Sequence, residues 1–148
     1  MPTKYVLPDC LHDQRVNGAA FVRWLHRKAQ AHVRRDKKRR IASVSLAGFK
    51  EAIYQAVVEA GGCDYYTGKP LDWHRISQWN NTEAAAKRGE YKKEFWNLPT
   101  VDHDFSDKGS TVFRLCSWRV NDAKNDQTID EFLELAKAIR IHRELSLK

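Results

Sequence analysis

Apolar and polar residues alternate in a helical pattern near the start of the chain. Between Phe21 and Val33, apolar side chains recur every three to four residues, which is the spacing of one helix face. Asp13 or Asn17 could cap the first turn, because short polar side chains accept hydrogen bonds from the unpaired N–H groups there. We therefore predict a helix and a linker over residues 13–44.

The same kind of pattern predicts two further helices. An apolar stripe from Leu46 to Ala60, closed by two glycines, predicts a scaffold helix over residues 45–62. Near the end of the chain, Thr128 and Glu131 have the spacing of a capping box. They predict a C-terminal helix over residues 128–148, and we expect its apolar side chains to pack back on the domain.

A different pattern, of short extended runs, lies between these helices. Residues 98–101 and 112–116 have the composition of two strands, and the loop between them is rich in turn formers. A polar stretch from Asn121 to Lys124 could then form one or two helical turns. Strand, loop, strand and helix in this order can gather polar groups from both ends around one point.

These short runs belong to a central unit over residues 63–126. Its first part, residues 63–71, reads as a small hairpin or knuckle. Residues 72–98 form an insertion, in which Thr82 could cap a helix that reaches Phe95 or Trp96. With 148 residues the chain is long enough for a single domain with its own core. The fold class we expect is α+β, a mostly helical small domain built around a hairpin–helix motif.

Composition narrows the class of protein. With 42% hydrophobic residues and five Trp, the chain is globular rather than disordered. No apolar run is long enough to span a membrane, and the N-terminus lacks the basic start and apolar core of a signal peptide. Cys10, Cys63 and Cys116 cannot all pair within one chain, which favours a cytoplasmic protein with reduced thiols.

The net charge of +7 is concentrated at the N-terminus. Residues 1–40 carry 11 Lys and Arg and three Asp and Glu, a net of +8, whereas residues 41–148 carry 15 and 16, a net of −1. Such a basic block is typical of contact with nucleic-acid phosphates or anionic lipid, although it could also be a solvated helix face. The candidates for nucleic-acid binding are Arg34, Arg35, Lys37, Lys38, Arg39 and Arg40 in this block, with Arg114, Arg119 and Lys124 further along the chain.

The pair Asp102-His103, at the end of the first expected strand, carries groups suited to phosphodiester hydrolysis. A neutral imidazole can take a proton from water near pH 7. Carboxylates and amide carbonyls are hard oxygen ligands for a divalent cation. Because neighbouring residues of a strand point to opposite faces, the two side chains can serve one centre only where the backbone is twisted or bulged.

The run VDHDF, the returning run FRLC and the later Asn121 resemble the HNH, or ββα-metal, endonucleases, in particular the phage endonuclease VII-type subgroup. The run CDYYTGKPL at 63–71 is similar to the first zinc knuckle of that family. The resemblance implies a metal-dependent endonuclease, bacterial or phage-encoded, that hydrolyses phosphodiester bonds in DNA. By position, it implies that His103 is the general base and that Asp102 and Asn121 hold one divalent cation, Mg²⁺ or Mn²⁺. Asp104 and Asp122 are alternative ligands if the register shifts by one residue.

Three features depart from the pattern of that family, one being that its middle Asn has no match near Ser110 to Val112. Tyr66 and Arg119 stand where the second cysteines of two Cys-x-x-Cys pairs would be. We therefore expect no structural zinc, and we expect Tyr65, Tyr66 and Trp118 to fill its place by packing. The spacing that leads to Asn121 is also one residue longer than usual.

Three functions stay open on the sequence alone. The first is the DNA endonuclease, for which RNA is an alternative substrate. The second is a non-catalytic nucleic-acid-binding protein on a degenerate HNH scaffold. The third is a helical protein whose basic helix docks on the acidic surface of a protein partner.

Overall fold

The computed structural model describes residues 4–40, 45–78, 81–87, 89–104 and 112–147. The first long helix, α1, spans Gly18–Lys38, and a short 3-10 turn at Asp9–Leu11 precedes it. The side chain of Asn17 accepts a hydrogen bond from the N–H of Ala20 at 2.8 Å, so Asn17 is the cap of α1. The predicted helix is thus confirmed, with Asn17 rather than Asp13 as its cap. Arg39 and Arg40, the last residues of the basic run, lie beyond its end.

Helix α2 spans Leu46–Glu59 and begins at Ser45, whose hydroxyl accepts a hydrogen bond from the N–H of Gly48 at 3.0 Å. Gly61 and Gly62 follow with φ values of +59° and +75°, a left-handed conformation that glycine adopts without strain. A Cβ on Gly62 would lie 2.7 Å from Cδ2 of Leu11, so this position also lacks room for a side chain. The predicted scaffold helix and its glycine stop are confirmed.

The sheet is a two-stranded antiparallel hairpin of β1, Pro99–His103, and β2, Phe113–Ser117. Helix α5, Trp118–Lys124, follows β2 directly and is capped by Ser117, whose side chain accepts from the N–H of Val120. The predicted order of strand, strand and helix is therefore present. The turn formers at 105–111 lie outside the described residues.

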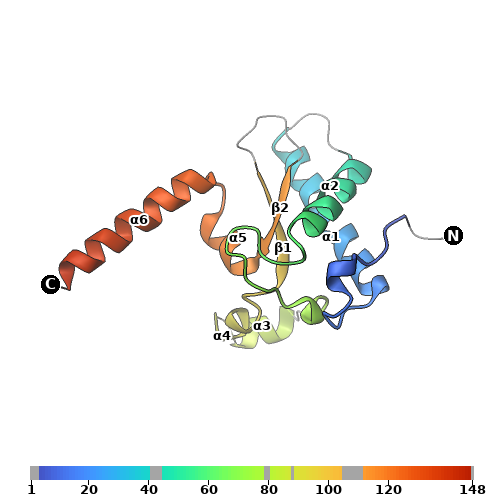
Figure 1. Cartoon of the computed structure of the whole chain (residues 1–148), viewed down its shortest axis with the longest axis horizontal. Helices are drawn as coiled ribbons and strands as arrows, with labels where there is room; N and C mark the ends of the chain where they lie inside the picture. Colours follow the sequence, from blue (N-terminus) through green and yellow to red (C-terminus); the bar gives the residue numbers. More distant parts are fainter. Residues whose placement is uncertain (1–3, 41–44, 79–80, 88, 105–111, 148) are drawn as a thin grey trace.

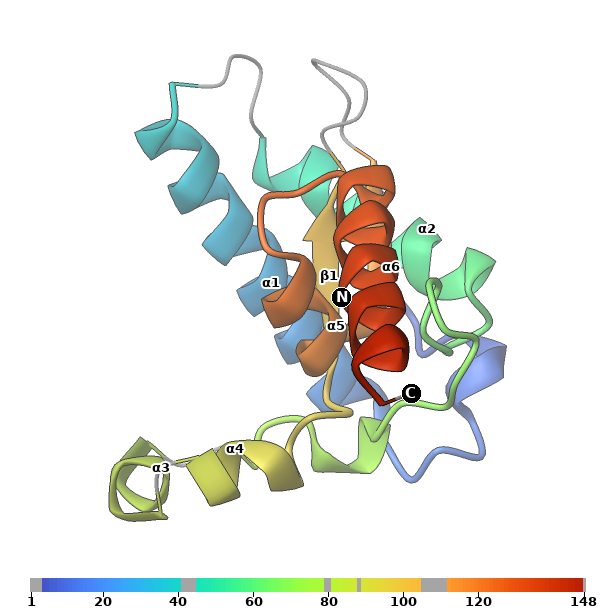
Figure 2. The ribbon, with the colours of Figure 1, turned by 90° about the vertical axis from the view of Figure 1, so that its left-hand side faces the viewer.

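Helices cover both faces of this hairpin (Figures 1 and 2). Helix α1 contacts α2 and β1, α2 contacts β2, and α5 contacts both strands. All five residues of β1 are buried, so the strand lies inside the domain rather than at an open edge. The largest fully buried side chains include Phe21, Phe49 and Trp73, and the Trp24 and Trp73 rings meet edge to face at 5.0 Å.

The insertion over residues 72–98 has more breaks than the sequence predicts. It contains a 3-10 turn at Trp73–Arg75 and two short helices, α3 at Asn81–Lys87 and α4 at Gly89–Glu94. Thr82 lies inside α3, so its predicted role as the cap of one longer helix is wrong. The second helix begins at Gly89, the residue with the lowest helix propensity of the segment.

Helix α6, Ile129–Ser146, starts at the predicted capping box. The Thr128 hydroxyl accepts from the N–H of Glu131 at 3.2 Å, and the Glu131 carboxylate accepts from the N–H of Thr128 at 2.9 Å. The prediction that this helix packs back on the domain is wrong, because none of its residues is buried and it projects from the body of the molecule (Figure 1). Its apolar side chains Leu133, Leu135 and Ile139 are 55%, 49% and 56% exposed, so the domain does not cover them.

Together these elements form a small α+β fold in which helices outnumber strands, as the sequence predicts. Within the described residues, no helix is both long and apolar enough to cross a membrane.

Candidate functional site

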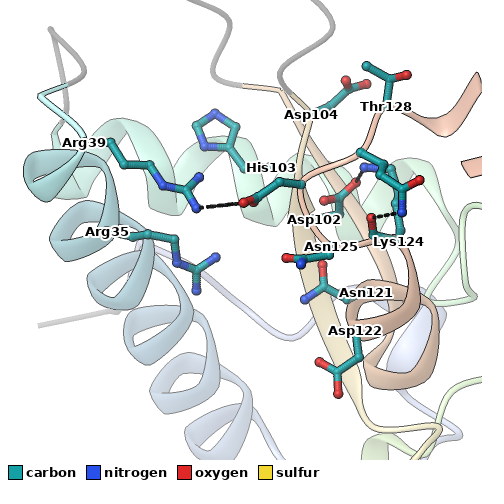
Figure 3. Close-up of a pocket in the computed structure, with 12 residues that line it drawn as sticks. Arg35, Arg39, Asp102, His103, Asp104, Asn121, Asp122, Lys124, Asn125 and Thr128 are labelled. Carbon is teal, nitrogen blue, oxygen red and sulfur yellow. Dashed lines mark hydrogen bonds and ion pairs between the residues drawn. The ribbon is translucent and has the colours of Figure 1, made fainter. Parts of the chain in front are cut away.

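A pocket of about 320 Å³ opens where the end of β1 meets the C-terminal part of α1 and the segment from α5 to α6 (Figure 3). Its walls are formed by Arg35, Arg39, Asp102, His103, Asp104, Asn121, Asp122, Lys124, Asn125, Asp126, Gln127 and Thr128. The general base, both metal ligands and both alternative ligands suggested by the sequence therefore line one pocket. Two arginines of the basic run line it as well.

Asp102 points from β1 toward α5. Its Oδ2 accepts hydrogen bonds from the Tyr66 hydroxyl at 2.6 Å and from the Lys124 ammonium at 2.9 Å. Asp102 and Lys124 are each only 5% exposed, so this is a buried ion pair. Burial, together with the hydrogen bond to Asp102, raises the pKa of Tyr66 and keeps the phenol protonated as a donor. Lys124, a candidate for phosphate contact, is thus committed to a carboxylate within the protein.

His103 points to the other face of the hairpin, toward α1 and α2. Its Nδ1 lies 3.2 Å from Oδ2 of Asp36, and its ring stacks on Phe113 with ring centres 4.5 Å apart. The Phe49 ring meets it edge to face, and the His103 side chain is only 4% exposed. As the alternation of a strand requires, Asp102 and His103 face opposite ways. The imidazole therefore forms one boundary of the pocket and has a carboxylate behind it.

Asp36 is the functional candidate that the sequence analysis missed. It is the single acidic residue of the run RRDKKRR, and it is fully buried. The available signal was its position four residues after His32, which places both side chains on the inner side of α1. His32 is also buried, and burial with the nearby Arg35 lowers its pKa to about 3, so its ring is neutral. A neutral His32 adds no positive charge that would compete with His103 for Asp36.

Each of the other carboxylates in the pocket has a cationic neighbour. Oδ1 of Asp126 lies 3.2 Å from the Arg39 guanidinium, Oδ2 of Asp104 lies 3.8 Å from Nε of Arg114, and Asp122 pairs with Lys92. Asn121 lies on the same wall of the pocket as Asp122 (Figure 3). The site is thus rich in charges of both signs, with Lys124 buried on α5 and Arg35 and Arg39 at the end of α1.

The donor chemistry of this wall fits a hard divalent cation. Asp102 and Asn121 offer a carboxylate and an amide oxygen, and Mg²⁺ is commonly held by one or two carboxylates with several waters and substrate phosphates. Within the described residues, no group of three or more His, Cys, Asp and Glu side chains could hold a metal ion by itself. An ion bound at Oδ2 of Asp102 would have to share that oxygen with Tyr66 and Lys124.

The basic run divides between two environments. Arg35 in α1 and Arg39 at its C-cap point into the pocket (Figure 3), whereas Arg34, Lys37, Lys38 and Arg40 are exposed elsewhere. Arg114 and Arg119 lie outside the pocket. Their guanidinium groups stack over Tyr65 and Trp96, each at 4.4 Å from the ring centre.

The segment over residues 63–71 is a turn closed on Asp64, a buried residue that the sequence analysis did not single out. Oδ1 of Asp64 accepts from the N–H groups of Tyr66 and Thr67 at 2.8 and 3.0 Å, and Oδ2 accepts from the N–H of Ser117 at 2.8 Å. These bonds tie the turn to the junction of β2 and α5. Tyr66, which stands at the place of a knuckle cysteine, is thereby held against Asp102.

No family model matches the chain, and neither does any curated protein or solved structure. The argument for function therefore rests on the residues and geometry of the pocket.

Proposed function

We propose that the protein is a metal-dependent endonuclease that hydrolyses phosphodiester bonds in DNA. The observation that supports this most directly is the pocket in which His103, Asp102 and Asn121 meet two arginines of the basic helix. A base, hard oxygen ligands and cations for the phosphate are the groups that this reaction needs. The substrate class and a cytoplasmic location follow from the basic block, the reduced thiols and the resemblance to HNH nucleases.

In this proposal His103 accepts the proton of the attacking water. The Asp36 carboxylate, with Oδ2 3.2 Å from Nδ1, lies beside the imidazole and would stabilise the positive charge that His103 gains with this proton. The phenyl rings of Phe49 and Phe113 fix the plane of the imidazole. Arg35, on the same helix as Asp36, and Arg39 at the C-cap of that helix orient the phosphate from the opposite wall.

Asp102 and Asn121 would hold the divalent cation, which when bound polarises the phosphate and stabilises the leaving oxygen. Tyr66 and Lys124 act on Asp102 from the side of the protein. Tyr66 fixes the orientation of the carboxylate, and Lys124 balances its charge.

Nicking of supercoiled plasmid with Mg²⁺ or Mn²⁺, against an EDTA control, tests the proposal. Replacing the general base should slow cleavage by roughly 10²–10⁴-fold, so His103→Gln should lose most activity and Asp36→Asn should lose a large part of it. His26→Gln is the matched control, because this partly exposed histidine of α1 does not line the pocket. Wild-type protein that leaves the plasmid intact with every divalent ion tested would exclude an endonuclease.

The arginines are tested separately, through the salt dependence of DNA binding. Each phosphate contact contributes about 0.9 to the slope of log K against log salt. Arg35→Gln/Arg39→Gln should reduce that slope by about 2. Arg34→Gln/Lys38→Gln removes the same charge from the same helix outside the pocket, and it should change the slope less. Equal effects of the two pairs would place the phosphates elsewhere on α1.

Two observations favour a second candidate, a non-catalytic nucleic-acid-binding protein. Lys124 already neutralises Asp102, and the His103 ring is enclosed by aromatic side chains. In such a protein the pocket would bind a phosphate through Arg35 and Arg39 without cleaving. Salt-dependent binding by wild type, unchanged in His103→Gln and without cleavage under any divalent ion, is the result that would select it.

A further inference from the structure

The pocket of His103 continues into a groove that follows α1. Two further hollows, of about 290 and 450 Å³, come after it, and each shares part of its wall with the one before. The shared walls are made by Arg35, Asn121 and Asp122 at the first junction and by Lys28, Ala31 and Trp118 at the second. Figure 3 shows the first junction, with Arg35 of α1 on one side and Asn121 and Asp122 of α5 on the other. Asp122 is paired there with Lys92.

The far end of this groove carries positive charge that the protein does not balance. Arg27 and Lys28 line it, and of the residues that the structure describes no Asp or Glu does. The Lys28 ammonium donates a hydrogen bond to the Thr100 hydroxyl at 3.1 Å, which is a neutral acceptor. Burial, with Arg27 and Arg35 nearby, lowers the pKa of Lys28 to about 8. An anion from outside the protein would supply the opposite charge.

The same end of the groove has apolar walls. Trp24, Ile76, Leu98 and Pro99 line it, and the half-buried Trp118 lies between it and the middle hollow. A ligand that fits apolar walls beside cations has a flat apolar face and an anionic group. A nucleotide has both, because every base has a π-face that can stack on an aromatic ring and every nucleotide carries a phosphate.

We propose that a single strand of DNA lies along this groove, with the base of one nucleotide on Trp118 and the phosphate of that nucleotide at Lys28. The proposal deepens the proposed function and rests on it for the position of the scissile phosphate, in the pocket of His103. Lys28 and Arg35 lie about 10 Å apart along α1. About three nucleotides cover that distance at the B-DNA spacing of about 3.4 Å per phosphate.

This arrangement favours a single strand over a duplex. In a duplex the faces of each base are covered by its neighbours, so a base could reach Trp118 only after it is unpaired and unstacked, which costs free energy. In a single strand the bases are open to an aromatic side chain.

Binding in EDTA, where no metal-dependent cleavage can occur, tests the groove with the full chain. An oligothymidylate of about 12 nucleotides should quench the tryptophan emission and bind at least tenfold more tightly than its duplex with oligoadenylate. Trp118→Leu should lose most of the quenching and bind roughly 5- to 150-fold more weakly, the range for one stacked base. Trp96→Leu is the matched control, because this half-buried tryptophan does not line the groove, and it should keep both the quenching and the affinity.

The salt dependence of the same binding tests Lys28. Each phosphate contact of a single strand contributes about 0.7 to the slope of log K against log salt, so Lys28→Gln should reduce the slope by about 0.7. Arg23→Gln removes one positive charge from an exposed position of the same helix outside the groove, and it should leave the slope nearly unchanged.

Three results would overturn the proposal: equal effects of the two tryptophan variants, equal slopes for Lys28→Gln and Arg23→Gln, or a duplex bound as tightly as the single strand. A wild type that binds the strand as expected but cleaves no DNA with any divalent ion would support the groove and exclude the nuclease. The two proposals therefore fail separately.

Discussion

Asp64 provides a quantitative test of how the site is held together. This buried carboxylate accepts three backbone hydrogen bonds, two within its own turn and one from Ser117 at the start of α5. Asp64→Asn keeps one oxygen, which can still accept the two bonds of the turn. Its amide group, however, would face the N–H of Ser117, and two donors would then meet without an acceptor.

The cost follows from these bonds. A buried donor left without a partner costs about 1–3 kcal/mol, and the lost charge assistance adds to it. We expect Asp64→Asn to lower the free energy of unfolding by about 2–3 kcal/mol and Tm by about 5–10 °C for a chain of this size. Asp64→Ala, which removes all three acceptors, should cost more.

Urea unfolding followed by circular dichroism measures these differences. Asp72→Asn is the control, because it makes the same chemical change nearby at a side chain that makes no capping hydrogen bond. It should stay within about 0.5 kcal/mol of wild type. If Asp64→Asn is as stable as Asp72→Asn, the turn is not held by this carboxylate.

Three further measurements address the surroundings of the site. Lys124→Met leaves the Asp102 carboxylate buried without its cation, so it should lower the free energy of unfolding by about 3–5 kcal/mol. If Mg²⁺ binds where the Lys124 ammonium lies, it should raise Tm of the variant more than that of wild type. Equal Tm shifts would show that the ion and the ammonium do not share a position. The pKa of His32 is about 3 in the folded protein and near 6.5 in the unfolded chain. Only the unfolded chain therefore takes up this proton as the pH falls below 6.5. The free energy of unfolding of wild type should decrease by about 2 kcal/mol between pH 7 and pH 5 for this reason. His32→Leu should lose that share of the pH dependence in urea titrations at the two pH values, and a dependence identical to wild type would contradict the shift. Burial raises the pKa of the Cys116 thiol, so a thiol reagent should modify it only after unfolding, and a native count of three reactive thiols would contradict its burial.

The periodic parts of the fold could be predicted from the sequence because their information is local. The stripe from Leu46 onward specifies α2, and the extended runs around Asp102 and Phe113 specify the hairpin. The polar partners could not be predicted in this way. Asp36 and His103 are 67 residues apart in the chain, and nothing near either of them indicates the other.

The sequence also did not reveal which side chain of α5 contacts Asp102. The sequence places polar residues over one to two turns of α5 but does not fix the rotation of that helix. Each residue turns the side chain by about 100°, so a one-residue difference in spacing changes which side chain reaches the strand. In the structure Lys124 meets Asp102, while Asn121 lies beside Asp122 on the wall.

Thr128 belongs both to the wall of the pocket and to the cap of α6. Only four residues, 125–128, separate α5 from α6, and Asn125 turns the chain there with a left-handed φ of 51°. Helix α6 and the pocket are therefore joined by one short connection. An insertion after Asn125 would therefore shift α6 relative to the pocket while leaving the side chains that β1 and α1 contribute to its walls in place.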